Sequence, residues 1–223
     1  NLTSVTIPDS VTSIGSSAFE YCRSLTNVVT PDSVSYIGSY AFYSCNNLAE
    51  INIPDSVMYI GDHAFFGCRS LENITSPNNI TKMGKNIFVT CNSLKSIIIP
   101  SSVLVIDEFA FAGCCRLKNL LIPNSVTTIG DYAFNFCSSL TSITLGSSVT
   151  NIGDSAFVSC YSLDTIYCHA ANPPMVESNT FINNDETNNY EAKLYRCRRD
   201  RYHPRHPWRG EGPALAGFSR YAL

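Results

Sequence analysis

The sequence contains few charged residues for a chain of its length. Only 15% of its 223 residues are Asp, Glu, Lys or Arg, whereas about a quarter is usual in a soluble domain. Serine, threonine and asparagine fill many of the positions that face solvent in the repeat described below. We therefore expect a surface that is polar but nearly uncharged.

Long apolar runs are also missing. No segment approaches the roughly 20 apolar residues that a membrane-spanning helix requires, so we predict no membrane span in this chain. No secretory signal peptide opens the sequence, and its first residues, NLTSVTIP, already belong to a repeat. Because repeat stacks need polar end caps and the first unit has none, we interpret the sequence as a piece of a longer protein.

Residues that commonly carry catalysis or hold metals are scarce. None of the four histidines stands at a known catalytic spacing from an acid or a nucleophile. A Cys-x-x-Cys pair is absent, so the spacing does not support a zinc site. Cys197, His203 and His206 could be drawn together as metal ligands, but their short segment gives this little support. We predict no enzymatic activity, no metal and no cofactor.

What the sequence does contain is a strict repeat. Seven cysteines recur with a 23-residue period, each with a phenylalanine three positions before it. A fixed period without insertions over about 160 residues indicates a solenoid of equal stacked units. We expect both lanes in its core, namely Cys22, Cys45, Cys68, Cys91, Cys114, Cys137 and Cys160 with Phe19, Phe42, Phe65, Phe88, Phe111, Phe134 and Phe157.

Each unit reads LxxIxIPxSVxxIGxxAFxxCxS and predicts one coil of the stack. Apolar residues two apart predict a short strand, which the proline ends because it has no N–H to donate. The glycine of the IG pair, such as Gly38, is expected to turn the chain with a positive φ. The AFxxC segment is too short for a stable α-helix, so we expect a single helical or 3₁₀ turn.

The cysteine lane also raises the possibility of disulfides. Neighbouring coils place equivalent Cα atoms about 4.8 Å apart, which is within disulfide range. Equivalent side chains in stacked coils point the same way, however, and seven cysteines cannot all pair. We therefore predict buried, reduced thiols that act as small apolar fillers.

The unit IPxSVxxIGxxAFxxCxSL resembles the BspA-type leucine-rich repeat of surface proteins from anaerobic bacteria and some parasitic protists. The resemblance implies an α/β repeat solenoid, a right-handed leucine-rich-repeat stack of 23-residue units with a short-strand parallel sheet on one face. It also implies a secreted or cell-surface location. Adhesion to host matrix or plasma glycoproteins, or to other microbes, is the function it suggests.

The chain divides into three expected parts. Residues 1–163 form seven 23-residue leucine-rich repeats, and residues 164–195 supply an eighth strand and a closing segment. Residues 196–223 form a basic Arg/Pro/Gly tail with 7 arginines against 2 acids, whereas residues 1–195 hold 8 Lys and Arg against 16 Asp and Glu. Since this composition occurs nowhere upstream, we interpret the tail as a frame-shifted reading of the family's cap. The alternative is a basic arm for nucleic acid or anionic surfaces, which such a short Arg-rich run supports only weakly.

The outward positions of the strands are the candidate binding surface. Most carry small polar side chains, as an ordinary solvated sheet does, but Ile98 and Leu121 form an apolar pair on adjacent coils. The candidate binding residues are Asn73, Ser96, Ile98, Asn119, Leu121 and Tyr167. A second aromatic lane follows the IG corner and either binds or simply covers it; its members are Tyr40, His63, Phe109 and Tyr132.

Two functions follow from this organisation. The first is a non-enzymatic extracellular interaction or adhesion module that binds host or microbial surface proteins through the strand face. Eight coils give a face roughly 34 Å long, enough for an interface of about 800 Å² per partner. The second is a structural spacer that projects another domain of a larger surface protein. Only the module has outward residues whose change abolishes binding without lowering stability.

Overall fold

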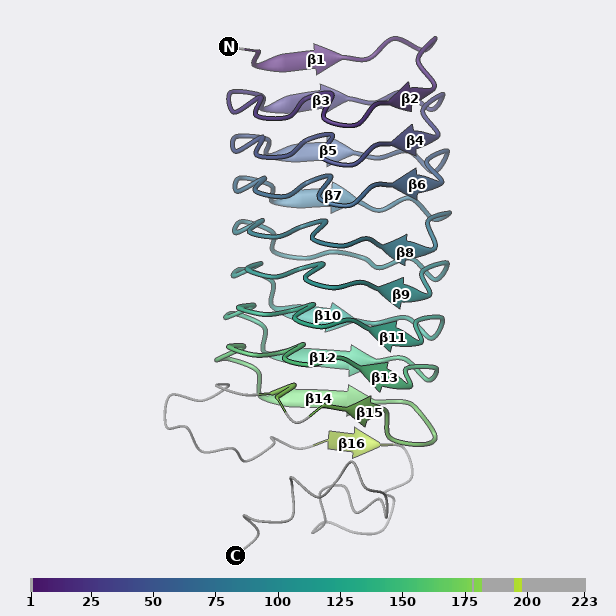
Figure 1. Ribbon diagram of the computed structural model, residues 1–223, viewed down its shortest axis with the longest axis vertical. Coiled ribbons are helices and arrows are strands. Elements are labelled where there is room, and N and C mark those ends of the chain that lie inside the picture. The colour runs from purple at the N-terminus through teal and green to yellow at the C-terminus, as the bar shows by residue number, and fades with distance from the viewer. Residues whose placement is uncertain (1, 178, 182–194, 198–223) are drawn as a thin grey trace, which may run out of the picture.

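The computed structural model describes residues 2–177, 179–181 and 195–197, which form a parallel-strand β-solenoid of about eight turns (Figure 1). Strands of successive turns pair one 23-residue repeat apart, as Ser4 with Asn27 and Asn27 with Glu50, except at the C-terminal end, where Asn151 pairs with Met175 and Ile166 with Tyr195. We number the coils from the leucine that opens each one. Coil one is residues 2–24, and each later coil begins one repeat further on, so that coil five is 94–116 and coil six is 117–139.

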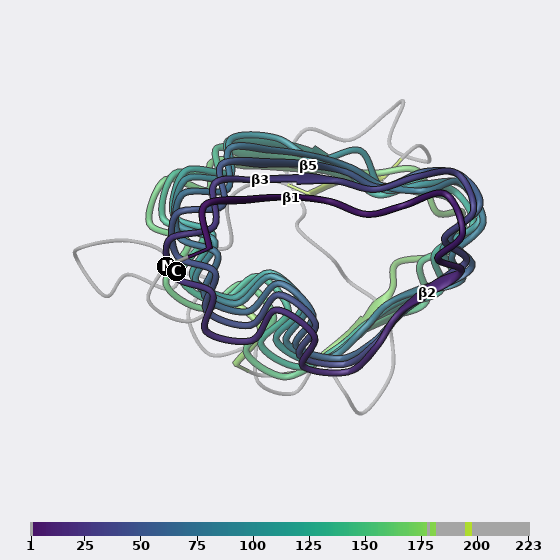
Figure 2. The ribbon, with the colours of Figure 1, turned by 90° about the horizontal axis from the view of Figure 1, so that it is seen from above.

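One side of the stack, which we call the strand face, carries the longer strands (Figures 1 and 2). They belong to two four-stranded parallel sheets, ordered β1-β3-β5-β7 and β10-β12-β14-β16. Their bounds are β1 Ser4–Thr6, β3 Asn27–Val29, β5 Glu50–Asn52, β7 Asn73–Thr75, β10 Asn119–Leu121, β12 Ser142–Leu145, β14 Thr165–Cys168 and β16 Tyr195–Cys197.

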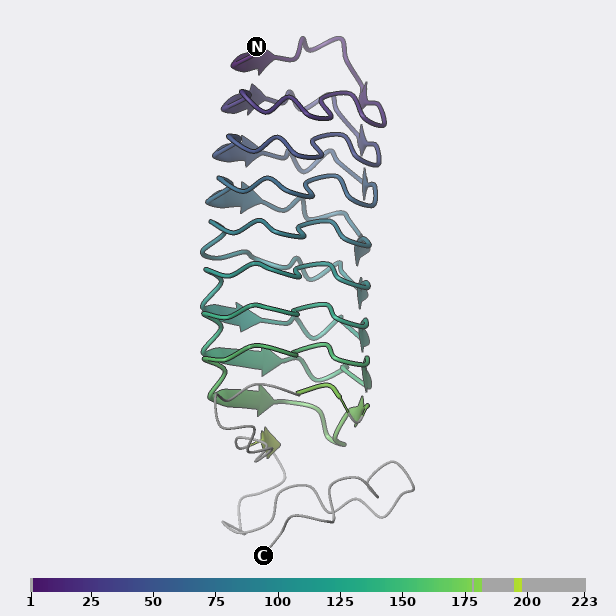
Figure 3. The same ribbon diagram turned by 60° about the vertical axis from the view of Figure 1, so that its left-hand side comes forward.

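A second side carries two-residue strands, one in each coil, which we call the second sheet face (Figure 3). These strands form one sheet of three and one of five, ordered β2-β4-β6 and β15-β13-β11-β9-β8. Their bounds are β2 Ser13–Ile14, β4 Tyr36–Ile37, β6 Tyr59–Ile60, β8 Lys82–Met83, β9 Val105–Ile106, β11 Thr128–Ile129, β13 Asn151–Ile152 and β15 Met175–Val176.

The third side is built from the AFxxC segments, where the expected single helical or 3₁₀ turn is not confirmed. The described residues contain no helix, so the α/β part of the classification is not confirmed, whereas the solenoid of 23-residue units is. In coil one the N–H of Glu20 bonds back to Ser17, but the next N–H, of Tyr21, bonds to Tyr43 in coil two. Because alternate N–H groups point to the neighbouring coil, the intra-chain ladder of a helix cannot propagate.

The glycines of the IG pairs also differ from expectation. Among the described residues only Gly67 and Gly113 are glycines with positive φ, and neither belongs to an IG pair. The IG glycines are needed for space instead: a Cβ on Gly61 would overlap the backbone nitrogen of Ser39 in the preceding coil. The positive φ is taken two residues later, for example by His63 at 60°.

The core runs the length of the stack and is lined by the repeating apolar positions. The phenylalanine rings form a continuous column in which neighbouring centroids, such as those of Phe42 and Phe65, are 5.4 Å apart. Phe181 extends the column beyond Phe157 at 5.5 Å. Phe19, in coil one, is only partly buried, while the other lane members, Phe42, Phe65, Phe88, Phe111, Phe134 and Phe157, are buried.

The cysteine lane lies beside this column and does more than fill space. Cys68 is a reduced thiol, and its Sγ donates a hydrogen bond to the carbonyl oxygen of Phe42, 3.2 Å away in the preceding coil. Burial raises the pKa of the Cys160 thiol to about 12. The same carbonyl contact is made by Cys45, Cys91, Cys114, Cys137 and Cys160.

Candidate interaction surfaces

The strand face places Ile98 and Leu121 side by side on coils five and six. Ile98 is 82% exposed and Leu121 is 65% exposed, whereas the preceding residues, Ile97 and Leu120, are turned into the core. An aliphatic side chain left this open contributes nothing to the core of its own chain. The pair is therefore a candidate contact for another molecule.

The other sequence-predicted binding residues lie at different distances from this pair. Ser96 and Asn119 are exposed on the same two coils, and Asn73 lies one coil earlier. Asn119 is committed to its own chain, since its Oδ1 accepts hydrogen bonds of 2.9 Å from the hydroxyls of Thr141 and Ser142. Tyr167 pairs in register with Thr144 on β12 and so lies two coils beyond Leu121.

The sheet is interrupted where Ile98 lies. Within the described chain, residues 96–98 form no strand, and no backbone hydrogen bond links them to β7 or to β10. An ion pair joins coils four and five near this point, with the Nζ of Lys95 2.6 Å from Glu72 Oε2. The sequence gives no warning of this interruption, because Ser96, Ile97 and Ile98 are ordinary strand residues.

The predicted aromatic lane after the IG corner forms two short stacks. The ring of Tyr40 stacks on His63 with centroids 4.6 Å apart, and Phe109 stacks on Tyr132 at 4.8 Å. Asn86 stands at the position between them. Burial lowers the pKa of His63, while the charge of nearby Asp62 acts in the opposite direction.

Two further aromatic clusters were missed by the sequence reasoning. Tyr43 and Phe66 stack with centroids 4.8 Å apart beside the Tyr40 and His63 stack. On the second sheet face, Tyr36 and Tyr59 stack at 5.1 Å next to exposed Met58. The 23-residue spacing of each aromatic pair was the available signal.

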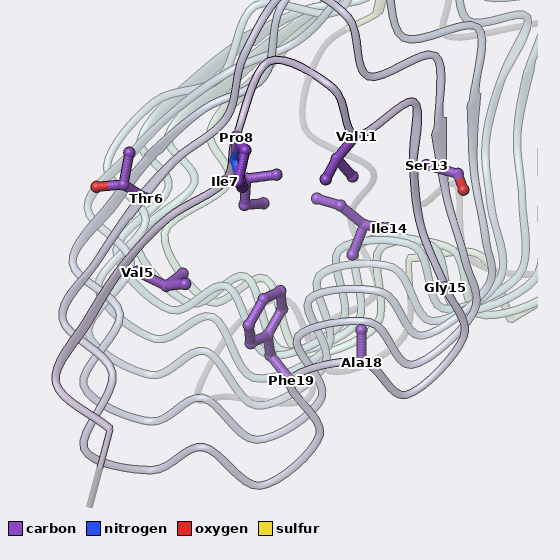
Figure 4. A pocket seen from close by; sticks show the side chains of 10 residues that line it. All are labelled: Val5, Thr6, Ile7, Pro8, Val11, Ser13, Ile14, Gly15, Ala18 and Phe19. Carbon is purple, nitrogen blue, oxygen red and sulfur yellow. The ribbon is translucent and has the colours of Figure 1, made fainter.

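An apolar hollow of about 280 Å³ opens at the first coil (Figure 4). It is lined by Val5, Ile7, Val11, Ile14 and Phe19, among others, which point inward from all three sides of the coil. In later coils the residues at these positions are covered by the coil before them. The hollow is thus the stacking surface of a repeat and not a shaped ligand pocket.

The described surfaces carry no candidate metal centre. Within residues 2–177, 179–181 and 195–197, no three His, Cys, Asp or Glu side chains are placed to hold a metal ion. A helix long and apolar enough to cross a membrane is likewise absent from this part of the chain. Residues 198–223 of the basic tail lie outside the described residues, and so do the proposed ligands His203 and His206 and the side chain of Cys197.

Solved structures of bacterial leucine-rich repeat proteins are similar to this one. A protein of Bacteroides ovatus is 32% identical, with a TM-score of 0.65, over 82% of this chain and 53% of its own. One from Eubacterium ventriosum is 27% identical, with the same TM-score, over 71% and 43%. The T. pallidum leucine-rich repeat protein is 29% identical, with a TM-score of 0.59, over 74% and 69%. The chain thus spans about half the length of the first two.

A search of curated proteins found no match. The model of a family described as the BspA type leucine-rich repeat region matches residues 1–115 and 104–194, in six copies. These matches cover more than half of the sequence and coincide with the coils of the solenoid. The chain therefore belongs to the BspA-type leucine-rich repeat family.

Proposed function

We propose that this chain is a non-enzymatic, extracellular interaction or adhesion module that binds host or microbial surface proteins through its strand face. Host matrix or plasma glycoproteins are the partners to test first. The observation that supports the proposal is the exposed pair of Ile98 and Leu121 on adjacent coils of a sheet whose other outward side chains are mostly polar. The resemblance of the repeat unit to surface proteins of anaerobic bacteria supports a secreted or cell-surface location.

The energetics of such a surface are those of a small hot spot. Burying one aliphatic side chain against a partner contributes about 1.5–3 kcal/mol, and a few such anchors carry most of the energy of an interface. Asn73, Ser96 and Tyr167 would then lie around the anchors, where polar contacts add specificity. A regular stack holds these side chains at fixed spacing, so little conformational entropy is lost on binding.

The test is binding of the full chain to immobilised matrix and plasma glycoproteins, compared with the double variant Ile98→Asp, Leu121→Asp. Met58→Asp is the matched control, because Met58 is 68% exposed on the second sheet face. We expect the double variant to lose binding at least tenfold with an unchanged melting temperature, and the control to bind normally. Equal binding by all three proteins would contradict a site on the strand face. Binding by none would instead favour a structural spacer.

A further inference from the structure

Positive charge is concentrated around the apolar pair of the strand face. Residues 2–177 contain seven Lys and Arg residues. Three of them, Lys95, Arg116 and Lys118, lie in coils five and six, which also carry Ile98 and Leu121. Lys95 and Lys118 occupy the same repeat position and stand three residues before Ile98 and Leu121 respectively. Coils seven and eight, by contrast, have no Lys or Arg among their described residues.

The lysines of coil four are held by acids of the stack itself. Lys82 lies 3.6 Å from Asp62 and 3.8 Å from Asp107, and Lys85 lies 3.1 Å from Glu108. These ion pairs lie beside the second sheet face, and in them the acids neutralise the charges of the lysines. They leave no net positive charge on that side.

The cations around Ile98 are only partly compensated. Lys95 pairs with Glu72, whose carboxyl pKa is lowered by the Lys95 hydrogen bond and charge, and also by Arg116. Glu72 is one carboxylate among three cations. Neither Arg116 nor Lys118 makes an ion pair with any described residue, and both are exposed.

We propose that Ile98 and Leu121, together with Lys95, Arg116 and Lys118, bind an acidic segment of a partner protein that carries aliphatic side chains among its carboxylates. The proposal rests on the proposed function and names the chemistry of its partner. An apolar centre with a charged rim is the usual anatomy of a protein interface. The rim charges select acidic partners and speed their association.

The exposed aliphatic pair decides which kind of partner fits this surface. A polyanion would need only the cations. A polypeptide with aliphatic side chains among its carboxylates can also cover Ile98 and Leu121, so the combination favours a protein segment.

Three labelled eleven-residue peptides test the proposal by fluorescence anisotropy with the full chain. One alternates Glu with Leu, one alternates Lys with Leu, and one alternates Glu with Ser. We expect the Glu and Leu peptide to bind at least tenfold more tightly than either of the others. Its affinity should fall as salt is raised from 50 to 300 mM, because the rim charges are exposed.

Two variants locate the site on the protein. Arg116→Glu with Lys118→Glu should weaken binding of the Glu and Leu peptide at least tenfold. Arg23→Glu with Arg69→Glu changes the net charge equally but acts on coils one and three, so it should alter affinity less than twofold. The basic tail is identical in all of these proteins and cancels from the comparison.

The outcomes separate this inference from the proposed function. Matrix proteins could bind through Ile98 and Leu121 with an affinity that neither salt nor the Arg116→Glu, Lys118→Glu variant changes. In that case the inference of an acidic partner is wrong, and the proposed adhesion surface is still supported. If the Glu and Leu peptide binds as tightly to Ile98→Asp, Leu121→Asp as to the original chain, charge alone is responsible and the inference is overturned. The inference would be overturned in the same way if the Ile98→Asp, Leu121→Asp variant bound heparin and the Glu and Leu peptide with equal affinity.

Discussion

The Sγ of Cys91 lies 3.2 Å from the carbonyl oxygen of Phe65 and donates its hydrogen to it across the boundary between two coils. The same oxygen already accepts the backbone N–H of Cys68, at 3.2 Å. The thiol is therefore a second donor to a carbonyl that has two lone pairs, and it lies in a core with no exposed surface at Cys91.

Replacing this thiol separates its packing from its hydrogen bond. We expect Cys91→Ala to lower the free energy of unfolding by about 1–2 kcal/mol, from lost volume and one lost hydrogen bond. Cys91→Ser should lose less, because the hydroxyl can still donate to Phe65. Urea melts measure both losses. The half-buried Cys22 of coil one is the control site, where alanine removes less buried volume and should cost less than at position 91. Equal losses for Ser and Ala at position 91 would mean that the thiol only fills space.

Alkaline pH should destabilise the stack through its buried thiols. Burial raises the pKa of Cys45 and of Cys160 to about 12 and that of Cys91 well above its usual range. The contribution of these thiols to the free energy of unfolding is therefore complete below about pH 8.5, the pKa of a thiol in the unfolded chain. It declines as the pH rises toward the higher pKa of the thiol in the folded chain. Each such thiol contributes a slope of up to about 1.4 kcal/mol per pH unit.

Urea melts between pH 7.5 and 10.5 measure this slope. Cys91→Ala should have a shallower slope than the original chain, because all other titratable groups are the same in both proteins. A slope unchanged by the substitution would contradict the assignment to buried thiols.

The IG glycines offer a matched pair of substitutions. A Cβ at position 61 would overlap the Ser39 backbone, whereas a Cβ at Gly15 would meet nothing within 4 Å. We expect Gly61→Ala to lower stability by at least about 2 kcal/mol through overpacking. Gly15→Ala should change it by less than about 0.5 kcal/mol, the usual range for a substitution that touches nothing. Equal effects in thermal melts would show that backbone conformation, and not the neighbouring coil, requires glycine.

Mild acid should weaken the aromatic stack around His63. Because burial lowers the pKa of this imidazole in the folded chain, the unfolded chain binds its proton first as pH falls below about 6.5. Stability therefore decreases with decreasing pH in that range. The variant His63→Tyr carries at this position the same residue type as the equivalent Tyr40 of the preceding coil. It should lose less stability than the original chain between pH 7 and pH 5. An identical loss in both proteins would assign the effect to other groups.

The sequence predicted whatever depends on the period alone. The 23-residue spacing implied the register of Ser4 with Asn27, and the alternation of apolar residues indicated that Ile98 points outward. It did not predict how the coils bond to one another. A helical turn at AFxxC is a reasonable local expectation. The N–H of Tyr21, which would continue such a helix, donates instead to the carbonyl oxygen of Tyr43 on the next coil.

The candidate site was foreseeable in part for the same reason. Exposure of Ile98 and Leu121 follows from strand alternation, whereas the interrupted ladder beside them depends on the spacing of whole coils. The glycine error has a related origin, because the crowding at Gly61 comes from Ser39 in the preceding coil. Tyr36 and Tyr59 were missed because the second face was treated as a corner and not as a sheet.

The interruption at residues 96–98 also concerns the mechanics of the protein. On the strand face, coils four to six lack the backbone ladder that joins the other coils, so the second sheet face and the AFxxC side carry the connection there. A chain pulled along its stacking axis should consequently open more readily at this point of the strand face than at the paired strands beside it. Tension on a tethered molecule would then widen the surface that presents Ile98.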